Sequence, residues 1–300
     1  MEIKIPLSVP ASKKSEYKHN YSLATGGTGH LMLIAGDQKV EHLNDDFFGA
    51  GISKEDASPE HLFKIANATK GALFATHLGL ISRYGSDYPH IPYLVKLNGK
   101  SNIGLNEEKN SSKCWWKVED VVNFKKQSGL KIVGIGYTLY LGGKFEAEML
   151  ARVARAIYKA HENGLIAIIW VYPRGKNIKE EDIHTIAGGA GMAACLDADF
   201  AKVKYPYGGK NNKLTAEKFQ EVTSAAGRTK IICVGGDKRT AKEMLTTTQE
   251  QLNIAKTSGL AIGRNLHQRP LAEAIKLAND LSAVIHETKK KSHSNFLGLF

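Results

Sequence analysis

Cysteine is scarce in this sequence, with three residues in a chain of 300: Cys114, Cys195 and Cys233. Their number is odd, they are widely spaced, and no two form a C-x-x-C pair, so they predict neither a disulfide framework nor a zinc site. Such cysteine usage is typical of a reducing compartment, and we expect a cytoplasmic protein.

Long apolar runs and export signals are also absent from the sequence. No apolar stretch approaches the length needed to cross a bilayer, and the start Met1-Glu-Ile-Lys-Ile-Pro6 lacks the charged-then-apolar layout of a secretory signal. We therefore predict no membrane partner.

Acidic residues are fewer than basic ones: the sequence has 30 Asp and Glu and 41 Lys and Arg, which gives a formal net charge of +11. Such a charge favours an anionic partner, which by charge alone could be nucleic acid, an acidic surface or a phosphorylated metabolite. Part of the excess lies in the tail Lys289–Asn295, whose three consecutive lysines are too few to indicate a nucleic-acid-binding arm. We predict no nucleic-acid partner.

What the sequence does contain is a hydrophobic content of 42%, enough for a full core, arranged as short segments rich in Ile, Val and Leu. These segments predict eight strands: Leu31–Ala35, Ala72–Thr76, Tyr93–Leu97, Ile132–Tyr137, Leu165–Val171, Phe200–Lys204, Lys230–Val234 and Leu260–Gly263.

Helical spacing of apolar residues follows most of these strands. It predicts helices over Pro59–Lys70, Phe145–Asn163, Thr215–Ala226, Thr240–Ser258 and Pro270–His286. The alternation favours an α/β fold, a single-domain (β/α)8 TIM barrel over residues 1–300, with an N-terminal extension of about 1–30 and a basic tail of about 288–300. An open doubly wound sheet repeats the same unit and remains the structural alternative.

Two lysines stand at alternate positions of the sixth predicted strand, Lys202 and Lys204, and so point to the same face. Inside a closed sheet, burial and a neighbouring cation would both lower the pKa of Lys202 and expose a nucleophilic amine. The alternative is a lysine whose ammonium group reaches the rim of the strand and stays in water.

Glycine-rich turns end the last two predicted strands. Gly235 and Gly236 follow the seventh strand, and Gly263 with Arg264 follows the eighth. In a barrel these two loops often bind phosphate through backbone N–H groups, and an arginine can add a bidentate contact. Taken alone, the glycine pair is an ordinary tight turn and Arg264 a salt-bridge residue at the rim.

Six ordered strings resemble the archaeal-type class I fructose-bisphosphate aldolases. They are Ile34-Ala-Gly-Asp-Gln38, Leu94-Val-Lys-Leu-Asn-Gly99, Trp170-Val-Tyr-Pro-Arg-Gly175, Ala198-Asp-Phe-Ala-Lys202, Val234-Gly-Gly236 and Ile262-Gly-Arg-Asn265. The resemblance covers most of the chain apart from its first thirty residues and its basic tail. It is more specific to the superfamily than to the substrate.

The resemblance implies roles for individual residues. Lys202 would form the Schiff base, Tyr172 would donate and accept the proton, and Asp37 would assist proton transfer and carbinolamine formation. Substrate binding would fall to the residues Trp170, Lys204, Gly235, Gly236, Gly263 and Arg264.

This chemistry has electrostatic requirements. The phenol of Tyr172 normally has too high a pKa for its task, and we expect Lys202 and Lys204 to lower it. Trp170 and Tyr172 share a face of their own strand and could meet the lysine pair, although packing at the barrel end is the alternative. Lys96 is expected to point into the barrel as an additional charge.

Three functions stay open from the sequence. The favoured one is reversible, metal-independent and cofactor-free cleavage of fructose 1,6-bisphosphate to dihydroxyacetone phosphate and glyceraldehyde 3-phosphate by a lyase. The others are a related transferase, thiolase or lyase acting on another phosphorylated keto sugar, and a binding barrel without catalysis. The resemblance also implies a homo-oligomer with a phosphorylated sugar as its substrate.

Two loops leave the substrate open. Many relatives continue after the lysine strand with a Tyr-Thr-Gly-Asp turn, whereas this chain has Tyr205-Pro-Tyr-Gly-Gly-Lys210, whose last lysine could bind a second phosphate or face solvent. The segment Lys100–Lys117 is expected to be a loop over the active end or at a subunit contact.

Glu41 and His42 are expected to make structural hydrogen bonds rather than to bind a metal.

Overall fold

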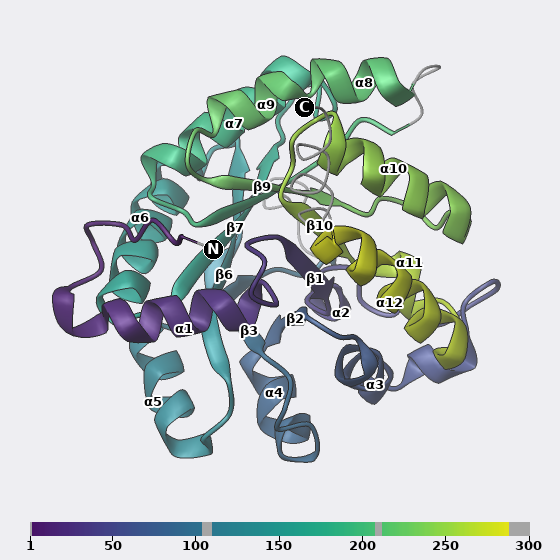
Figure 1. The fold of residues 1–300 in the computed structure, drawn as a ribbon, viewed down its shortest axis with the longest axis horizontal. Coiled ribbons are helices and arrows are strands. Elements are labelled where there is room, and N and C mark those ends of the chain that lie inside the picture. The colour runs from purple at the N-terminus through teal and green to yellow at the C-terminus, as the bar shows by residue number, and fades with distance from the viewer. Residues whose placement is uncertain (1, 104–109, 208–211, 288–300) are drawn as a thin grey trace, which may run out of the picture.

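Eight parallel strands form a closed barrel in the computed structural model, which describes residues 2–103, 110–207 and 212–287 (Figure 1). The strands are β1 (Leu31–Ala35), β2 (Ala72–His77), β3 (Tyr93–Lys96), β6 (Ile132–Leu141), β7 (Ile166–Pro173), β8 (Phe200–Val203), β9 (Lys230–Val234) and β10 (Gly259–Ile262). Their order around the barrel is β1-β10-β9-β8-β7-β6-β3-β2. Because β1 pairs with both β2 and β10, the sheet has no edge, and the predicted (β/α)8 barrel is confirmed over the open sheet.

Helices surround the barrel and connect its strands (Figure 1). They are α1 (Lys14–Ala24), α2 (Gln38–Glu41), α3 (Glu60–Ala68), α4 (Leu78–Tyr84), α5 (Val118–Ser128), α6 (Glu146–Glu162), α7 (Ile183–Cys195), α8 (Asn212–Lys218), α9 (Gln220–Ala225), α10 (Ala241–Asn253), α11 (Arg264–His267) and α12 (Leu271–Glu287). Short 3₁₀ helices lie at Ala11–Lys13, Lys54–Ala57 and Gly85–Asp87, and β4 (Asn98–Gly99) pairs with β5 (Lys113–Cys114) in a small antiparallel sheet. None of the described helices combines the length and apolar character needed to cross a membrane.

Side chains alternate between two cores along each strand, because successive residues of a strand point to opposite faces. On β1, Leu31 and Leu33 fill the barrel interior, whereas Met32 and Ile34 pack outward against the helices. On β8, Phe200 belongs to the interior cluster, so the same alternation directs Lys202 inward.

The N-terminal residues close one end of the barrel. Helix α1 lies across β2, β6 and β7 (Figure 1), and Tyr17 and Tyr21 are buried with the interior cluster. The ring of Tyr21 stacks on Phe200 at the start of β8, with centroids 5.6 Å apart. The predicted extension thus covers the end of the barrel at which the strands begin.

Helix predictions were less complete than strand predictions. The five predicted helices are present, but the one predicted over Thr215–Ala226 is two helices, α8 and α9. Helices α1, α2, α4, α5, α7 and α11 were not predicted. The basic tail of residues 288–300 lies outside the described residues.

Candidate active site

A cavity of about 330 Å³ opens at the C-terminal ends of the strands. All nine residues assigned from the sequence to the chemistry or to the substrate line this cavity: Asp37, Trp170, Tyr172, Lys202, Lys204, Gly235, Gly236, Gly263 and Arg264. The fold therefore gathers residues from β1, β7, β8, β9 and β10 at one mouth, as expected for a barrel.

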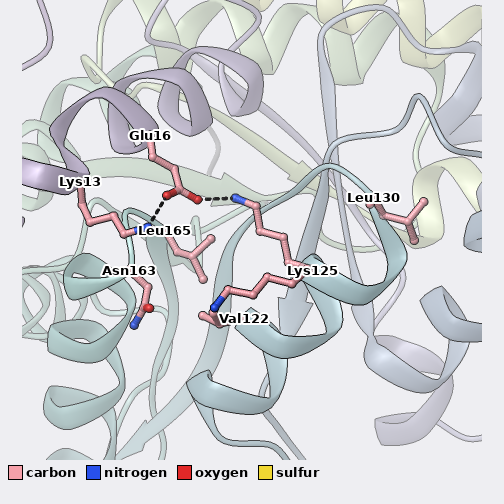
Figure 2. Close-up of a pocket in the computed structure, with 9 residues that line it drawn as sticks. Lys13, Glu16, Val122, Lys125, Leu130, Asn163 and Leu165 are labelled. Atoms are coloured by element: carbon pink, nitrogen blue, oxygen red, sulfur yellow. Dashed lines mark hydrogen bonds and ion pairs between the residues drawn. The ribbon is translucent and has the colours of Figure 1, made fainter.

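A larger cavity of about 550 Å³ lies elsewhere, between α1, α5 and the turn that precedes β7. Figure 2 shows its charged lining, in which Glu16 of α1 pairs with Lys13 and with Lys125 of α5 at 2.7 and 2.9 Å. Its lysines are therefore partly neutralised, and it shares no residue with the cavity at the barrel mouth. The larger volume of this cavity therefore does not identify it as the active site.

Lys202 is the central ionisable group of the barrel mouth. It is 5% exposed, and its ammonium nitrogen lies 4.9 Å from the centre of the Trp170 ring on the neighbouring strand β7. Burial lowers the pKa of Lys202 to about 8, with Lys96 and Arg264 acting in the same direction and Asp37 opposing them. About a tenth of this amine is therefore unprotonated near neutral pH, far more than for an ordinary lysine.

Lys96 and Asp37 form a buried ion pair beside Lys202. The Lys96 ammonium, 0% exposed, donates to Asp37 Oδ2 at 2.9 Å and to Thr138 Oγ1 at 2.6 Å. Burial would raise the pKa of Asp37, but Lys96 and Lys202 outweigh it and hold that pKa well below its usual range. Asp37 is thus a carboxylate, and among the described residues its second oxygen, Oδ1, has no hydrogen-bond partner.

A glycine on β6 makes room for this arrangement. A Cβ at Gly136 would lie 2.9 Å from the Trp170 ring and 3.2 Å from Lys96 Cδ. Any larger residue would push the ring or the lysine away. Lys96 therefore reaches Asp37 because the strand between β3 and β7 carries no side chain at this level.

Tyr172 lines the cavity next to Tyr140, whose ring is 6.2 Å away on β6. Burial and the charges of Asp37 and Glu41 raise the pKa of Tyr172 well above its usual value of 10.0, and Arg174 opposes them. The expectation that Lys202 and Lys204 lower this pKa is therefore wrong. Tyr172 is a neutral phenol in this site, because burial and the nearby carboxylates both oppose a further negative charge.

Lys204 does not supply the cation expected beside Lys202. Its ammonium binds Glu180 Oε2, and Glu180 Oε1 accepts from Arg174 Nε at 2.8 Å. The neighbouring cation that lowers the pKa of Lys202 most is Lys96. Lys202 and Lys204 point to the same face but have different partners, because Glu180 contacts only Lys204.

The glycine turns after β9 and β10 lie side by side at the other part of the mouth. Gly236 has a φ of +71°, and a Cβ at Gly263 would lie 2.1 Å from the side-chain oxygen of Gln38. Asn265 Nδ2 donates to the carbonyl oxygens of Gly235, Gly236 and Asp237 and so joins the two turns. Left-handed backbone and close approach require glycine here.

Arg264 combines the two roles considered from the sequence. It lines the cavity and pairs through Nη1 at 3.0 Å with Asp237, which is 88% exposed, while its Nε lies 3.9 Å from Asp46 Oδ2. Such an exposed pair is weak and can be exchanged for a stronger anion. Arg264 is therefore available to a phosphate that enters the mouth.

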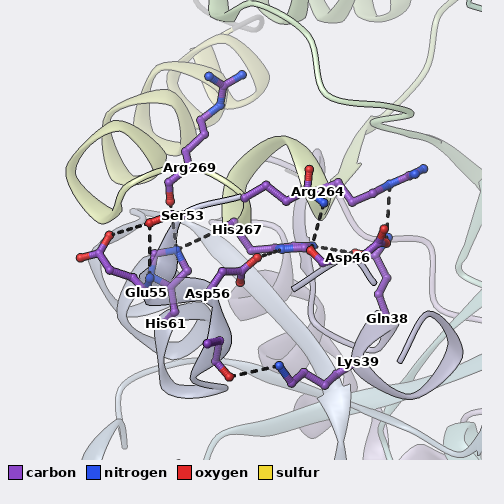
Figure 3. A network of polar contacts seen from close by, with 12 residues as sticks. Gln38, Lys39, Asp46, Ser53, Glu55, Asp56, His61, Arg264, His267 and Arg269 are labelled. Atoms are coloured by element: carbon purple, nitrogen blue, oxygen red, sulfur yellow. Dashed lines mark hydrogen bonds and ion pairs between the residues drawn. The ribbon is translucent and has the colours of Figure 1, made fainter. Parts of the chain in front are cut away.

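A buried polar network contacts the side chain of Gln38 through His267 (Figure 3). His267 Nδ1 lies 2.6 Å from Asp56 Oδ2, and His267 Nε2 lies 3.3 Å from Gln38 Oε1. The ring of Phe47 stacks on His267 with centroids 4.6 Å apart. The network links the segment after β1 to α11 and fixes the side of the mouth next to Gly263.

Two other candidates from the sequence, His42 and the segment Lys100–Lys117, contribute to the lining of the cavity. His42 Nδ1 pairs with Asp46 Oδ2 at 2.6 Å, in agreement with a structural role. The segment Lys100–Lys117 contributes Lys100 and Asn102 to the cavity and contains β5, while its residues 104–109 lie outside the described residues. Lys210 lies outside them as well.

These features define a class of protein: a (β/α)8 barrel with a buried lysine amine of lowered pKa, a carboxylate and a phenol at the mouth. The chain belongs to the DeoC/LacD family of aldolases, because the model of that family matches residues 31–269. A relative from Methanocaldococcus jannaschii, 52% identical over 96% of this chain and 92% of its own length, supports this assignment. That protein is named fructose-bisphosphate aldolase/6-deoxy-5-ketofructose 1-phosphate synthase.

Solved structures support the same family. A fructose-bisphosphate aldolase from Slackia heliotrinireducens has a TM-score of 0.91 and 45% identity over 96% of this chain and 91% of its own. An archaeal fructose-1,6-bisphosphate aldolase has a TM-score of 0.76 and 26% identity over 90% of this chain and 99% of its own. In that structure the catalytic lysine is covalently bound to the carbinolamine intermediate of the substrate.

Sequence reasoning missed two participants of the site, Thr138 and Glu180. Thr138 could have been found from the alternation Gly134-x-Gly136-x-Thr138, in which small inward residues on one strand leave space for long side chains from its neighbours. Glu180 lies seven residues after the end of β7, and no spacing signal connects it to Lys204.

Proposed function

We propose that this protein is a class I aldolase that cleaves fructose 1,6-bisphosphate reversibly to dihydroxyacetone phosphate and glyceraldehyde 3-phosphate through a Schiff base on Lys202. The observation that carries the proposal is the buried amine of Lys202, with a pKa of about 8, beside the Lys96–Asp37 pair. Membership of an aldolase family supports it.

The first step is addition of the neutral Lys202 amine to the ketone carbon of the sugar. The carbinolamine loses water to give a protonated imine, which accepts the electron pair of the carbon–carbon bond that breaks and becomes an enamine. Asp37 suits the proton transfers of carbinolamine formation, because it is ionised and its Oδ1 is unpaired among the described residues.

Tyr172 suits the proton transfers of bond cleavage and formation. As a neutral phenol it can protonate the oxygen of an incoming aldehyde when the bond forms, and cleavage reverses this transfer. The protonated imine adds a positive charge to the pocket, which favours loss of the phenol proton at that stage. Reprotonation of the enamine and hydrolysis then release the product and restore Lys202.

Phosphate groups would bind on two sides of Lys202. The turns with Gly236 and Gly263, together with Arg264, form one cationic side, and Arg174 with Lys204 forms the other. A sugar with a phosphate at each end fits between them, because positive side chains and backbone N–H groups bind phosphate oxygens.

A second activity is favoured by the Methanocaldococcus jannaschii relative, whose name includes 6-deoxy-5-ketofructose 1-phosphate synthase. That name describes a product with phosphate on carbon 1 and none on carbon 6. We propose that this chain also accepts an aldehyde without phosphate as the partner of its enamine.

Reductive trapping tests the proposed nucleophile. The protein is incubated with dihydroxyacetone phosphate or with fructose 1,6-bisphosphate and reduced with borohydride, and its peptides are analysed by mass spectrometry. We expect an adduct on Lys202 and none in Lys202→Met. An adduct on Lys204 would exchange the roles of the two lysines, and no adduct with either ligand would refute the fructose-bisphosphate proposal.

Localisation and assembly remain predictions. All three cysteines are free, which supports the cytoplasm as the expected compartment. The homo-oligomer implied by the family resemblance can be tested by light scattering coupled to size-exclusion chromatography.

A further inference from the structure

Glu180 bridges Arg174 and Lys204, the two cations on one side of the mouth, although it does not itself line the cavity. Its two carboxylate oxygens accept from different donors, Oε1 from Arg174 Nε at 2.8 Å and Oε2 from the Lys204 ammonium. Burial would raise the pKa of Glu180, but the hydrogen bonds from Lys204 and Arg174 outweigh it and lower that pKa. An ionised carboxylate thus bridges the two cations that line this side of the cavity.

The loop that carries Glu180 is held close to the barrel. The backbone N–H of Arg174 donates to the Leu141 carbonyl at 2.7 Å, and a Cβ at Gly175 would lie 2.5 Å from the carbonyl oxygen of Gly142. A Cβ at Gly142, whose φ is +88°, would meet Ile178 at 1.9 Å. The loops after β6 and β7 therefore pack backbone to backbone, and Glu180 is presented from a fixed segment.

The two cationic sides of the mouth differ in the strength of the ion pairs that their cations make with acidic residues. Arg264 pairs through Nη1 at 3.0 Å with Asp237, which is 88% exposed, and its Nε lies 3.9 Å from Asp46 Oδ2, so the shorter of its two pairs is screened by solvent and a phosphate can replace Asp237. The side chain of Glu180 is only 27% exposed and contacts two cations instead of one. A phosphate that binds Arg174 and Lys204 from the cavity meets cations whose charge Glu180 already partly neutralises, whereas an uncharged group loses nothing by this pairing.

We propose that Glu180 is a specificity-determining residue that weakens the preference for a phosphate at the end of the sugar opposite the Gly263–Arg264 turn. The inference rests on the proposed aldolase function and refines its substrate class. Specificity of this kind comes from a repulsive group directed against one ligand. Glu180 would thus allow partner aldehydes with and without phosphate to be used by the same site.

The substitution Glu180→Gln tests this role, because it removes the charge and keeps the shape. The readout is the ratio of kcat/KM for fructose 1,6-bisphosphate to kcat/KM for fructose 1-phosphate, which carries only one phosphate. Removing one negative charge within a few ångströms of a phosphate is expected to raise this ratio by about tenfold. The neighbouring Glu181→Gln makes the same charge change at an exposed residue that is not the partner of Arg174 or Lys204 and should leave the ratio unchanged.

A fall in the ratio would overturn the proposal, since Glu180 would then position Arg174 and Lys204 for the phosphate. An unchanged ratio would also overturn it. Calorimetric titration with inorganic phosphate needs no turnover: Glu180→Gln should bind phosphate more tightly than the unsubstituted protein, and equal binding would refute the role. If neither sugar is cleaved, the proposed function fails while phosphate binding still decides the role of Glu180.

Discussion

At the residue scale, the reactivity of Lys202 depends on charges that arrive from other strands. The K-x-K spacing predicted a buried, inward-facing Lys202, as the structure has it, but the expected second cation, Lys204, pairs with Glu180. The cation that acts on Lys202 is Lys96, which comes from β3 and is held by Asp37 and Thr138. Such a partner is invisible to spacing along one strand, because it depends on the closed order of the barrel.

Replacing Lys96 with methionine should raise the pKa of Lys202. The substitution removes the cation that lowers this pKa and leaves Asp37 without its ion pair, so both effects favour the charged amine. The pH profile of kcat/KM should move to higher pH, with activity at neutral pH falling about tenfold for each pKa unit. Rates of imine trapping measured over pH provide the check.

The matched control is Lys204→Met, which should leave the midpoint of this profile nearly unchanged because Lys204 is held by Glu180. The structural account would be wrong if Lys204→Met moved the midpoint and Lys96→Met did not.

Tyr172→Phe should separate imine formation from bond cleavage. The phenol is neutral in the site, and its proposed task is proton transfer at the bond that breaks, not attack on the ketone. Turnover should therefore fall by about 10² to 10⁴, while reductive trapping on Lys202 persists. Tyr140→Phe removes a hydroxyl from the adjacent, stacked ring and is the control. Loss of trapping in Tyr172→Phe would place the phenol in the earlier step.

At the element scale, α1 is joined to the barrel by a buried cluster at the beginning of the strands. Tyr17 donates to Asp199 Oδ1, and His161 lies between Asp199 and Asp197 at 3.0 and 3.3 Å. Ser8 donates to Asp197 at 2.6 Å. The cluster ties residues before β1 to α6 and to the turn before β8, so the N-terminal segment is an integral part of the barrel end.

This cluster should make stability depend on pH. Burial lowers the pKa of His161, but Asp197 and Asp199 outweigh it and raise that pKa to about 9 from 6.5. A raised folded-state pKa stabilises fully below the unfolded value, and the contribution is lost as pH rises through the folded value. Up to about 3 kcal/mol of the free energy of unfolding should therefore disappear between pH of about 6.5 and about 9.

Urea unfolding at a series of pH values measures this loss. His161→Gln should abolish most of the slope, whereas His184→Gln, a change at an exposed histidine of α7 that pairs with Glu221, should retain it. A slope that survives in His161→Gln would show that other groups carry the pH dependence.

Elements differ in how far the sequence could predict them. All eight strands were predicted because parallel barrel strands are apolar on both faces and appear as short continuous runs. Helix α7 was missed because Gly188, Gly189 and Gly191 lower its helix propensity. The structure supplies a reason for one of them, since a Cβ at Gly189 would lie 2.9 Å from Val171. The packing of α7 against β7 requires glycine at position 189, although glycine disfavours helix formation.

At the scale of the whole molecule, the net charge of +11 and the site agree in sign. The cavity mouth collects Lys100, Arg174, Lys202, Lys204 and Arg264 against Asp37 and Glu41. The excess of basic residues, from which the sequence alone could not choose a partner, is thus concentrated in part where a phosphorylated sugar would enter. An overall positive field also attracts such a ligand before contact.

Salt should therefore weaken the use of the bisphosphate more than that of a monophosphate. Fructose 1,6-bisphosphate carries about four negative charges and fructose 1-phosphate about two, so screening of the positive mouth affects the first more strongly. Raising sodium chloride from about 0.05 M to about 0.5 M shortens the screening length severalfold, and kcat/KM for the bisphosphate should fall several-fold while kcat changes little. A sucrose solution of equal osmolality is the control. Equal salt slopes for the two sugars would mean that the charge of the molecule does not guide the substrate, and that its basic residues serve solubility or another partner.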